Sequence, residues 1–474
     1  MGKRRAERMT LKIMVKDLTQ GRPGSVLFRF TLPVLGGNLF QLFYTLADTV
    51  IVGRTLGENA LAAVGSTSII IYLVLCFIQG FTGGFGICLG QRFGAKDEDG
   101  MRRSAGISWL LSLFFTIVLT LAGCLLAHPI LYWMQTPQDI YDDAYTYLFL
   151  ILLGTGATIF YNIVSNLLRA LGDSKTPLYF LILTSALNIG LDLLFIIPFH
   201  MGVLGAALAT DISQVISGVL SFAYLRRKFD VLKMEKGDMA YSKKACGRLL
   251  GIGVPMGLQC SITAIGSVIM QWAVNVLGST AVAAVTAAGK TQSLLTVPLE
   301  SVGTAMATYA GQNLGASRMD RVRQGVNRAL LIILVYALAS AFILHFTDVQ
   351  IMSLFLDTAK EVDIVNMGRE YLFWNSVFFI PLGALIVWRY TIQGLGFSTL
   401  AMMAGVAEMV ARTAVAIVLV PILGYFGAEL SNPAAWVAAC LFLYPAYKWT
   451  CRQLDNRLLA AKLHMRGDHA ETVL

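Results

Sequence analysis

The chain of 474 residues is too apolar and too weakly charged for a water-soluble protein. Apolar residues make up 56% of it and charged residues only 14%, whereas soluble chains carry about 25% charged residues. The net charge of +9 comes from basic residues in short stretches between apolar runs, with no basic stripe of the kind that binds nucleic acid. Disorder requires low hydrophobicity and is also excluded. Composition therefore predicts a polytopic membrane protein.

Twelve apolar segments are long enough to cross a bilayer as helices, which takes about 20 residues each. They are far longer than the ~9–11 residues of a membrane strand, so we expect an all-α membrane protein. The segments are residues 26–53, 62–89, 105–127, 141–167, 177–199, 203–225, 246–275, 282–310, 326–346, 364–388, 398–421 and 428–448.

The distribution of Lys and Arg orients these spans, because cytoplasmic loops are rich in both residues. With the N-terminus inside, 32 of the 37 Lys and Arg fall in segments on the cytoplasmic side, among them Arg389 in a segment 389–397. Three fall outside, namely Arg54, Lys360 and Arg369. We therefore expect an even number of spans and cytoplasmic N- and C-termini.

The chain contains an internal repeat. Residues 56–95 and 277–316 align without a gap, with 11 identities in 40, and Leu171–Gly172 matches Leu395–Gly396 further on. Six spans per half give both halves the same orientation, so their pseudo-twofold axis runs along the membrane normal. The expected parts are a basic cytoplasmic N-terminal segment, a six-helix bundle, a cytoplasmic linker, a second six-helix bundle and a cytoplasmic tail, at residues 1–25, 26–225, 226–245, 246–448 and 449–474.

Acidic residues inside spans need a reason, because a charged group at the centre of the bilayer costs ~2.5–3.5 kcal/mol. Glu408 and Arg412 are spaced i, i+4, and we expect them to neutralise each other on one helix. The acids that we single out within the expected spans are Asp48, Asp192, Asp211, Glu300 and Glu408.

Four polar residues of the first half can form a cation site. Asn188 and Asp192 are spaced i, i+4 and share a helix face, Asp48 lies in the first span and Thr210 in the sixth. Their carboxylate, amide and hydroxyl oxygens suit a small alkali cation, so Na⁺ is expected at Asp48, Asn188 and Asp192. A carboxylate in a dry site can instead carry a proton near neutral pH. The alternative is that these groups only join helices by hydrogen bonds.

Three further residues are candidates for roles around this site. Asp211 lies about 100° around its helix from Thr210 and either joins the site or extends to the interface. Glu300 contacts a cationic substrate or pairs with Lys290. Pro33 frees a carbonyl and kinks the first span, which would move Asp48 relative to the other acid. We expect Glu300 and Asp211 to bind substrate and Pro33 to act in gating.

Several motifs occur in order along nearly the whole chain and resemble the multidrug and toxic compound extrusion (MATE) family. They are LFQLFYTLADTVIVGRTLGENALAAVG (39–65), GICLGQRFGAKD (86–97), LRALGDSKTP (168–177), NIGLDLLFI (188–196) and TYAGQNLGA (308–316).

This resemblance implies a secondary antiporter of two six-helix bundles that exports organic, mostly cationic compounds in exchange for entering Na⁺ or H⁺. It is closest to the bacterial branch whose cation site lies in the N-terminal half. The family's cation-binding positions match Asp48 in YxxxD, Asn188 and Asp192 in NxxxD, and Thr210. It implies a monomer in a bacterial inner (plasma) membrane, with no cofactor beside the coupling ion.

Three other functions remain open from the sequence. A lipid-linked oligosaccharide flippase of the same architecture would line its cavity with Arg and Lys, and here only Lys290 and Arg412 lie well inside the expected spans, away from their ends. A membrane enzyme needs a nucleophile–base pair or a metal cluster, and no His lies mid-span with partners. A channel is disfavoured by two non-identical halves without a filter motif.

Overall fold

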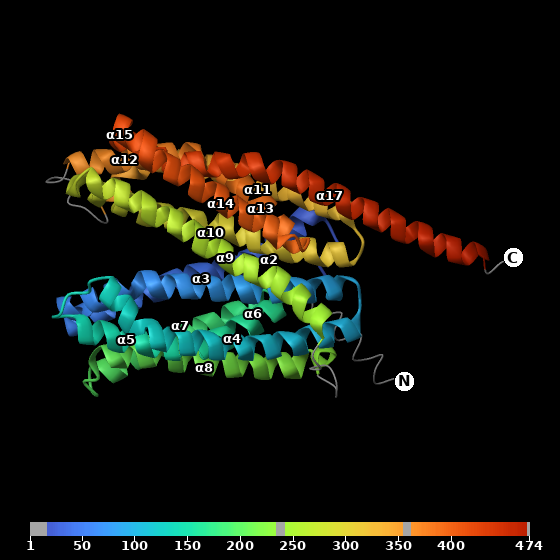
Figure 1. Cartoon of the computed structure of the whole chain (residues 1–474), viewed down its shortest axis with the longest axis horizontal. Helices are drawn as coiled ribbons and strands as arrows, with labels where there is room; N and C mark the ends of the chain where they lie inside the picture. The colour runs from blue at the N-terminus through green and yellow to red at the C-terminus, as the bar shows by residue number, and fades with distance from the viewer. Residues whose placement is uncertain (1–16, 234–241, 354–361, 472–474) are drawn as a thin grey trace. The chain divides into compact units, whose positions relative to one another are not determined.

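The computed structural model describes residues 17–233, 242–353 and 362–471, and these residues form helices without any strand (Figure 1). The expected N-terminal segment 1–25 and linker 226–245 therefore lie partly outside the described residues. The helices are α2 (Pro23–Leu56), α3 (Glu58–Gly94), α4 (Glu98–Trp133), α5 (Tyr141–Leu153), α6 (Thr155–Ala170), α7 (Lys175–Ile196), α8 (Gly202–Lys228), η1 (Asp230–Leu232), α9 (Lys243–Val276), α10 (Ser279–Gly315), α11 (Met319–Met352), α12 (Val362–Val377), α13 (Phe379–Gly394), α14 (Ser398–Ala414), the π-helix η2 (Val415–Leu419), α15 (Val420–Leu423), α16 (Tyr425–Glu429) and α17 (Ser431–Glu471).

The helices have the lengths and compositions of membrane spans, as the sequence predicts. Nine stretches of the described chain are long and apolar enough to cross a membrane, or up to eleven if each bent helix pair counts as one span. Helix α10 has 37 residues but is not among these candidates, because its apolar residues are interrupted by polar ones. The finding is thus an all-helical chain with nine to eleven candidate spans.

Two of the expected spans are broken helices. The span expected at 141–167 is α5 and α6, bent by 43° at Gly154, and the span expected at 364–388 is α12 and α13, bent by 50° at Phe378. In the second pair Pro381 has no N–H to donate to the carbonyl four residues earlier, which interrupts the helix. In the first pair the glycine leaves room at the bend for a side chain of α8. The two breaks lie 224 residues apart, the offset already found for Leu171 and Leu395.

The internal repeat is also present in the backbone. Residues with positive φ, which are uncommon outside glycine, recur at matching positions of the two halves. The matching pairs are Gly57 and Gly278 (φ 87° and 100°), Lys96 and Ser317 (57° and 57°), Gly172 and Gly396 (86° and 91°), and Gly202 and Gly424 (60° and 61°).

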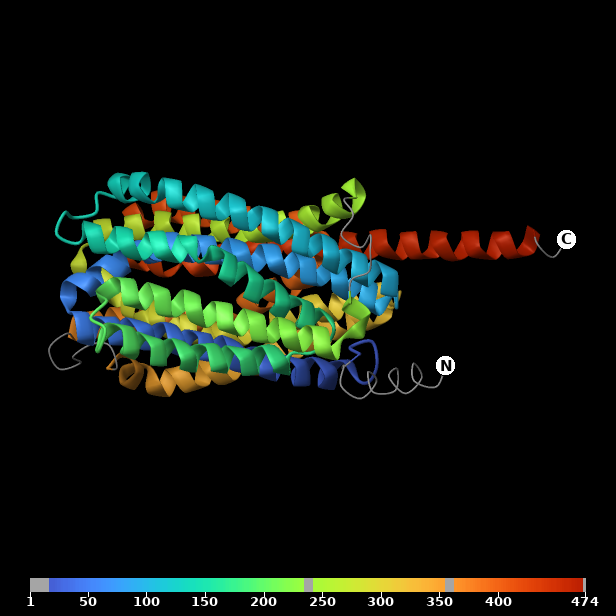
Figure 2. The same ribbon diagram turned by 90° about the horizontal axis from the view of Figure 1, so that it is seen from below.

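The contacts divide the chain into two compact units. Unit 1 contains residues 29–260 and unit 2 contains residues 18–28 and 261–474 of the described chain. Within unit 1, α3 to α8 run lengthwise beside one another, with α7 packed on α8 and α3 on α6 (Figures 1 and 2). Within unit 2, α10 packs on α11, α12 and α13, and α17 packs on α13 and α14 before its C-terminal part extends past them (Figure 1).

The division between the units falls inside α9, outside the expected linker. Residues 243–260 of α9 belong to unit 1, and the first six residues of α2 belong to unit 2. Likewise, α17 continues without a break from the last expected span into the expected tail 449–474.

The beginnings of α2 and α9 each belong to the unit formed mainly by the other half of the chain. Two glutamines at matching repeat positions bind these two chain segments. In unit 2, the side chain of Gln312 accepts a hydrogen bond from the backbone N–H of Leu18 at 3.0 Å, and Arg321 donates to the carbonyl of Gly21 at 2.9 Å. In unit 1, Gln91 accepts from Arg248 of α9 at 2.7 Å. Gln91 and Gln312 lie 221 residues apart, so the same motif anchors the beginning of the other half's first helix in each unit.

Helices α3 and α9 cross closely within unit 1 because glycines meet at the crossing. A Cβ atom on Gly84 would lie 2.5 Å from the Cα of Gly253. Backbones can approach this closely only where side chains are absent. The glycines of α3 thus serve helix packing.

Candidate functional site

The four residues of the expected cation site are brought together in unit 1. Asp48 comes from α2, Asn188 and Asp192 from α7, and Thr210 from α8. Asn188 and Asp192 are 0% exposed and Asp48 is 9% exposed. The i, i+4 spacing directs Asn188 and Asp192 to one face of α7, which packs on α8. We call these four residues the acidic cluster.

The acidic cluster contains more buried acceptors than donors. The side-chain amide of Asn188 donates to the hydroxyl of Thr210 at 3.2 Å. The carboxyl groups of Asp48 and Asp192 lie close enough for a hydrogen bond if one of them carries a proton. Four buried oxygens have no hydrogen-bond partner, namely Asp48 Oδ1, Asn188 Oδ1 and both oxygens of Asp192. Buried oxygens without donors favour a cation or a proton.

Two tyrosines complete the surroundings of the acidic cluster, and the sequence analysis did not single them out. The hydroxyl of Tyr44 hydrogen-bonds to Thr210, and Tyr147 of α5 is buried within electrostatic range of Asp48 and Asp192. Tyr44 precedes Asp48 by four residues and so shares its helix face. That spacing was a usable signal, whereas Tyr147 lies about 100 residues from Asp48 and carried none.

The structure places Asp211 next to the break between α5 and α6. A Cβ atom on Gly154 would lie 1.9 Å from Oδ1 of Asp211, so the carboxyl group occupies the space that the glycine leaves. Asp211 also lies within electrostatic range of Tyr44 and Tyr147. Asp211 of α8 therefore lies beside the acidic cluster, at the break between α5 and α6.

Two other sequence candidates lie on α10 and α2. Glu300 of α10 accepts a hydrogen bond from the hydroxyl of Tyr390 at 2.6 Å, a partner that the sequence analysis did not consider beside Lys290. Pro33 lies inside α2, which remains helical on both sides of it. Their roles in substrate binding and gating stay predictions.

A buried ion-pair network lies in unit 2. Glu408 and Arg412 interact at 3.8 Å with the expected i, i+4 spacing. The closer partner of Glu408 is Arg389, which is 7% exposed. Arg389, which the sequence places in a cytoplasmic segment 389–397, lies inside α13, because this helix continues to Gly394.

A further buried acid, Glu429, was not among the acids singled out from the sequence. Glu429 ends α16 and is 0% exposed, and both of its carboxylate oxygens lack a hydrogen-bond partner. It is the second residue of the expected segment 428–448, where the sequence analysis did not single it out. The structure buries it completely.

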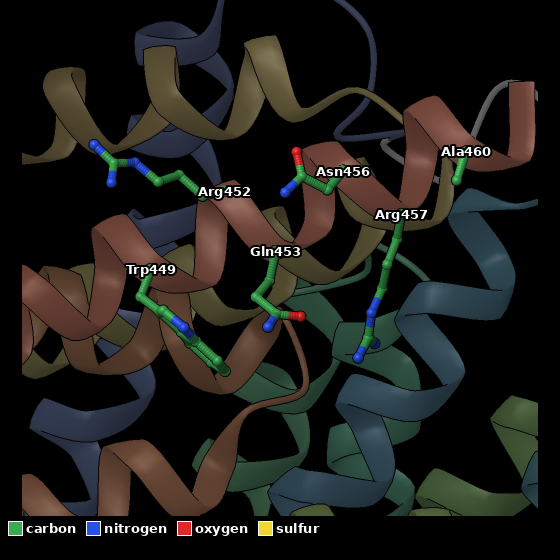
Figure 3. A pocket seen from close by; sticks show the side chains of 6 residues that line it. All are labelled: Trp449, Arg452, Gln453, Asn456, Arg457 and Ala460. Atoms are coloured by element: carbon green, nitrogen blue, oxygen red, sulfur yellow. The ribbon is translucent and has the colours of Figure 1, made fainter. Parts of the chain in front are cut away.

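A surface hollow of about 440 Å³ lies along α17, on one helix and away from the buried acids of unit 2. Trp449, Gln453 and Arg457, spaced four residues apart, extend the same way from this helix (Figure 3). No group of three or more His, Cys, Asp or Glu side chains that could hold a metal occurs among the described residues.

Comparison with known proteins agrees with this architecture. The MatE family profile matches residues 33–194 and 255–418, one stretch in each half. The Bacillus subtilis protein named "Probable multidrug resistance protein YpnP" is 30% identical over 384 residues, which cover 80% of this chain and 84% of that protein. "Probable multidrug resistance protein YoeA" of the same organism is 28% identical over 74% of this chain and 77% of its own.

Solved structures share the fold. A structure described as the outward-facing conformation of a multidrug resistance MATE family transporter has a TM-score of 0.87 at 23% identity, and the match covers 94% of this chain and 99% of that one. A structure of MATE in complex with MaL6 has a TM-score of 0.87 over 93% of this chain and 99% of its own. Because the family profile matches both halves and a 30% identical relative spans four-fifths of the chain, this protein belongs to the MatE family, the family that its motifs resemble.

Proposed function

We propose that this protein is a secondary active multidrug efflux transporter that exports organic, mostly cationic compounds in exchange for Na⁺ or H⁺. The observation that carries the proposal is the acidic cluster, in which four buried oxygens of Asp48, Asn188 and Asp192 lack a hydrogen-bond partner. The names of the relatives, which include probable multidrug resistance proteins, support the efflux activity.

The chemistry of the acidic cluster follows from its charge. Two adjacent ionised carboxylates repel each other in a dry site, and a shared cation or proton relieves this repulsion. The side-chain oxygens of Asp48, Asn188 and Asp192 would bind Na⁺, while Thr210 orients the amide of Asn188 so that its oxygen points away from the hydroxyl. For H⁺ coupling, one carboxyl takes the proton and donates it to the other.

Transport then requires that ion and substrate favour different states or compete for one space. An organic cation neutralises the acids in one state, and an entering Na⁺ or H⁺ replaces it in the other. A cation moving inward releases ~2.3 kcal/mol per 100 mV of membrane potential. Bending of α2 at Pro33 would change the position of Asp48 and so transmit ion binding to the rest of the helix.

The proposal includes twelve spans in two six-helix bundles with both termini in the cytoplasm. Helix α10 is the twelfth span, the bent pairs α5–α6 and α12–α13 are one span each, and so are α14 to α15 and α16 to α17. The excess of Lys and Arg on one side supports the orientation. The setting is a bacterial plasma membrane, the protein acts as a monomer, and Glu300 and Asp211 contact the substrate.

The test is efflux of a fluorescent organic cation from proteoliposomes with an imposed Na⁺ or pH gradient. Asp48→Asn and Asp192→Asn should each lose at least ten-fold in gradient-driven rate while inserting normally. Asp139→Asn removes an exposed carboxyl between α4 and α5 and serves as the matched control. The gradient that drives the wild-type protein identifies the coupling ion.

Two results would overturn the proposal. One is gradient-driven efflux that persists in the Asp48→Asn, Asp192→Asn double variant. The other is movement of a lipid-linked sugar across the same vesicles without any dye efflux, which would favour the flippase alternative.

A further inference from the structure

The two halves differ at one buried position where their sequences otherwise align. Residues 202–210, GVLGAALAT, match residues 424–432, GYFGAELSN, with the same positive φ at Gly202 and Gly424 (60° and 61°). Under this alignment Thr210 corresponds to Asn432 and Ala207 corresponds to Glu429. The second half thus carries a carboxyl group where the first half has a methyl group.

An apolar cluster lies at or beside each of the two positions. Ala207 is 0% exposed and belongs to a cluster with Val52, Val64 and Tyr147. Ala428, next to Glu429, belongs to the matching cluster of unit 2 with Met270 and Val415. Glu429 is 0% exposed, and neither of its carboxylate oxygens has a hydrogen-bond partner among the described residues. An ionised carboxylate in such a place would have neither water nor a donor to stabilise it.

The charged and titratable groups that face Glu429 supply no positive charge directly. Helix α16 packs against α12, α15, η2 and α17. Of these, α12 brings Glu370 and Tyr371 into electrostatic range, and α16 itself brings Tyr425. Tyr425 donates its hydroxyl hydrogen to the carbonyl of Met367 at 3.1 Å. Helices η2 and α15 contain no titratable residue, and neither does the first turn of α17.

The buried arginines of unit 2 pair with a different acid. Arg389 and Arg412 both interact with Glu408. Arg412 also donates to Asn432 at 3.4 Å, just as Asn188 donates to Thr210 at the matching place in the first half. The second half therefore carries a tethered guanidinium where the first half has an amide beside its cation site. A fixed positive charge at that position disfavours binding of a second metal cation there.

We propose that Glu429 is a proton-binding site in the second half, protonated in the conformation described here. When α16 and α12 separate enough to admit water, the O–H bond breaks, the proton passes to a water molecule, and the carboxylate remains. Arg412, which faces Tyr371 as Glu429 does, is the buried cation that can stabilise the carboxylate. The role of this proton in transport rests on the antiport function proposed above.

The first experiment needs no transport. The full-length protein in lipid nanodiscs is titrated with acid and base while infrared difference spectra are recorded in the region of protonated carboxylic acids. We expect a carbonyl band at neutral pH that disappears in Glu429→Gln and persists in Asp363→Asn, the matched removal of an exposed carboxyl on α12. It should also persist in the Asp48→Asn, Asp192→Asn double variant and should not respond to Na⁺.

Glutamine is uncharged and similar in size to glutamate, so the Glu429→Gln variant should fold. If that variant does not fold, Glu429→Ala is used instead, because alanine is the residue at the matching position of the first half. An unchanged band in both variants would overturn the proposal, and so would suppression of the band by Na⁺ at constant pH.

The second experiment measures protons exchanged per dye molecule with a pH indicator outside proteoliposomes. We expect Glu429→Gln to exchange about one proton fewer per dye than the wild type. An unchanged ratio, together with loss of the infrared band, would overturn the role of this proton in transport. If the wild-type protein shows no efflux at all, the antiport proposal fails while the infrared result still decides whether Glu429 binds a proton.

Discussion

Asn188 donates its side-chain amide to the hydroxyl of Thr210 across 3.2 Å, and this contact joins α7 to α8. It fixes which end of the amide faces the hydroxyl and leaves the amide oxygen without a partner beside the two carboxyl groups. A single hydroxyl group on α8 thus decides that an acceptor, and no donor, faces the place where we propose that a cation binds.

Replacing Thr210 by valine should weaken ion binding without harming the fold. The lost hydrogen bond with Asn188 is worth about 0.5–1.5 kcal/mol, so the ion concentration for half-maximal efflux should rise about two- to twelve-fold. Thr210→Ser should recover most of the effect because it keeps the hydroxyl. Thr45→Val, which removes an exposed hydroxyl from α2, should change nothing, and an equal shift in that variant would contradict the interpretation.

Gly154→Ala should act through Asp211. The added Cβ would lie 1.9 Å from Oδ1 of Asp211 and must displace that carboxyl group from the break between α5 and α6. Gly154→Ala and Asp211→Ala should therefore impair dye efflux to a similar degree, and the double variant should be no worse than either single one. Strictly additive effects on the efflux rate would show that the two residues act independently.

Removing Glu408 should destabilise unit 2 more than removing either arginine. Glu408→Ala leaves two buried guanidinium groups without their carboxylate, a loss of about 3–5 kcal/mol for a broken buried pair. Thermal unfolding in detergent should show the largest decrease for Glu408→Ala and a smaller one for Arg389→Met. A thermal midpoint unchanged by Glu408→Ala would mean that water reaches the network.

Adding one methyl group at the crossing of α3 and α9 should be far more damaging than adding it elsewhere on α9. Gly84→Ala puts a Cβ 2.5 Å from the Cα of Gly253, and overpacking of this kind costs about 1–3 kcal/mol. Gly251→Ala meets no atom within 4 Å and should stabilise the helix by about 0.4–1 kcal/mol. Thermal midpoints of the two variants should move in opposite directions.

Much of the fold follows from the sequence because apolar length and repetition are local properties. The repeat predicts the two halves, and the spacing of Asn188 and Asp192 predicts their shared face. The bends at Gly154 and Phe378 were not anticipated, since an apolar run has the same composition whether the helix within it is straight or broken. The burial of Arg389 was not anticipated either, because the acid that pairs with it lies on another helix.

Some residues of the candidate site could likewise be predicted from the sequence, and others could not. Asp48, Asn188, Asp192 and Thr210 were found because polar groups stand out against apolar surroundings. Tyr147 was not, because a tyrosine in a membrane span has many ordinary roles. Glu429 was missed because sequence position alone does not separate an acid at the end of a span from one that the following turn buries.

The exchanged helix ends make the two halves interdependent. The anchors of Leu18 and Gly21 on α10 and α11, and of Arg248 on α3, mean that each compact body is completed by residues encoded with the other repeat. If the gene were divided between α8 and α9, it would yield two products. Each product would lack the helix beginning that completes its own packed unit, and would expose the helix beginning that packs in the other unit. Such products should become protease-resistant only when they are synthesised together. An ancestral single six-helix chain would for the same reason have had to pair with a second copy of itself before the duplication.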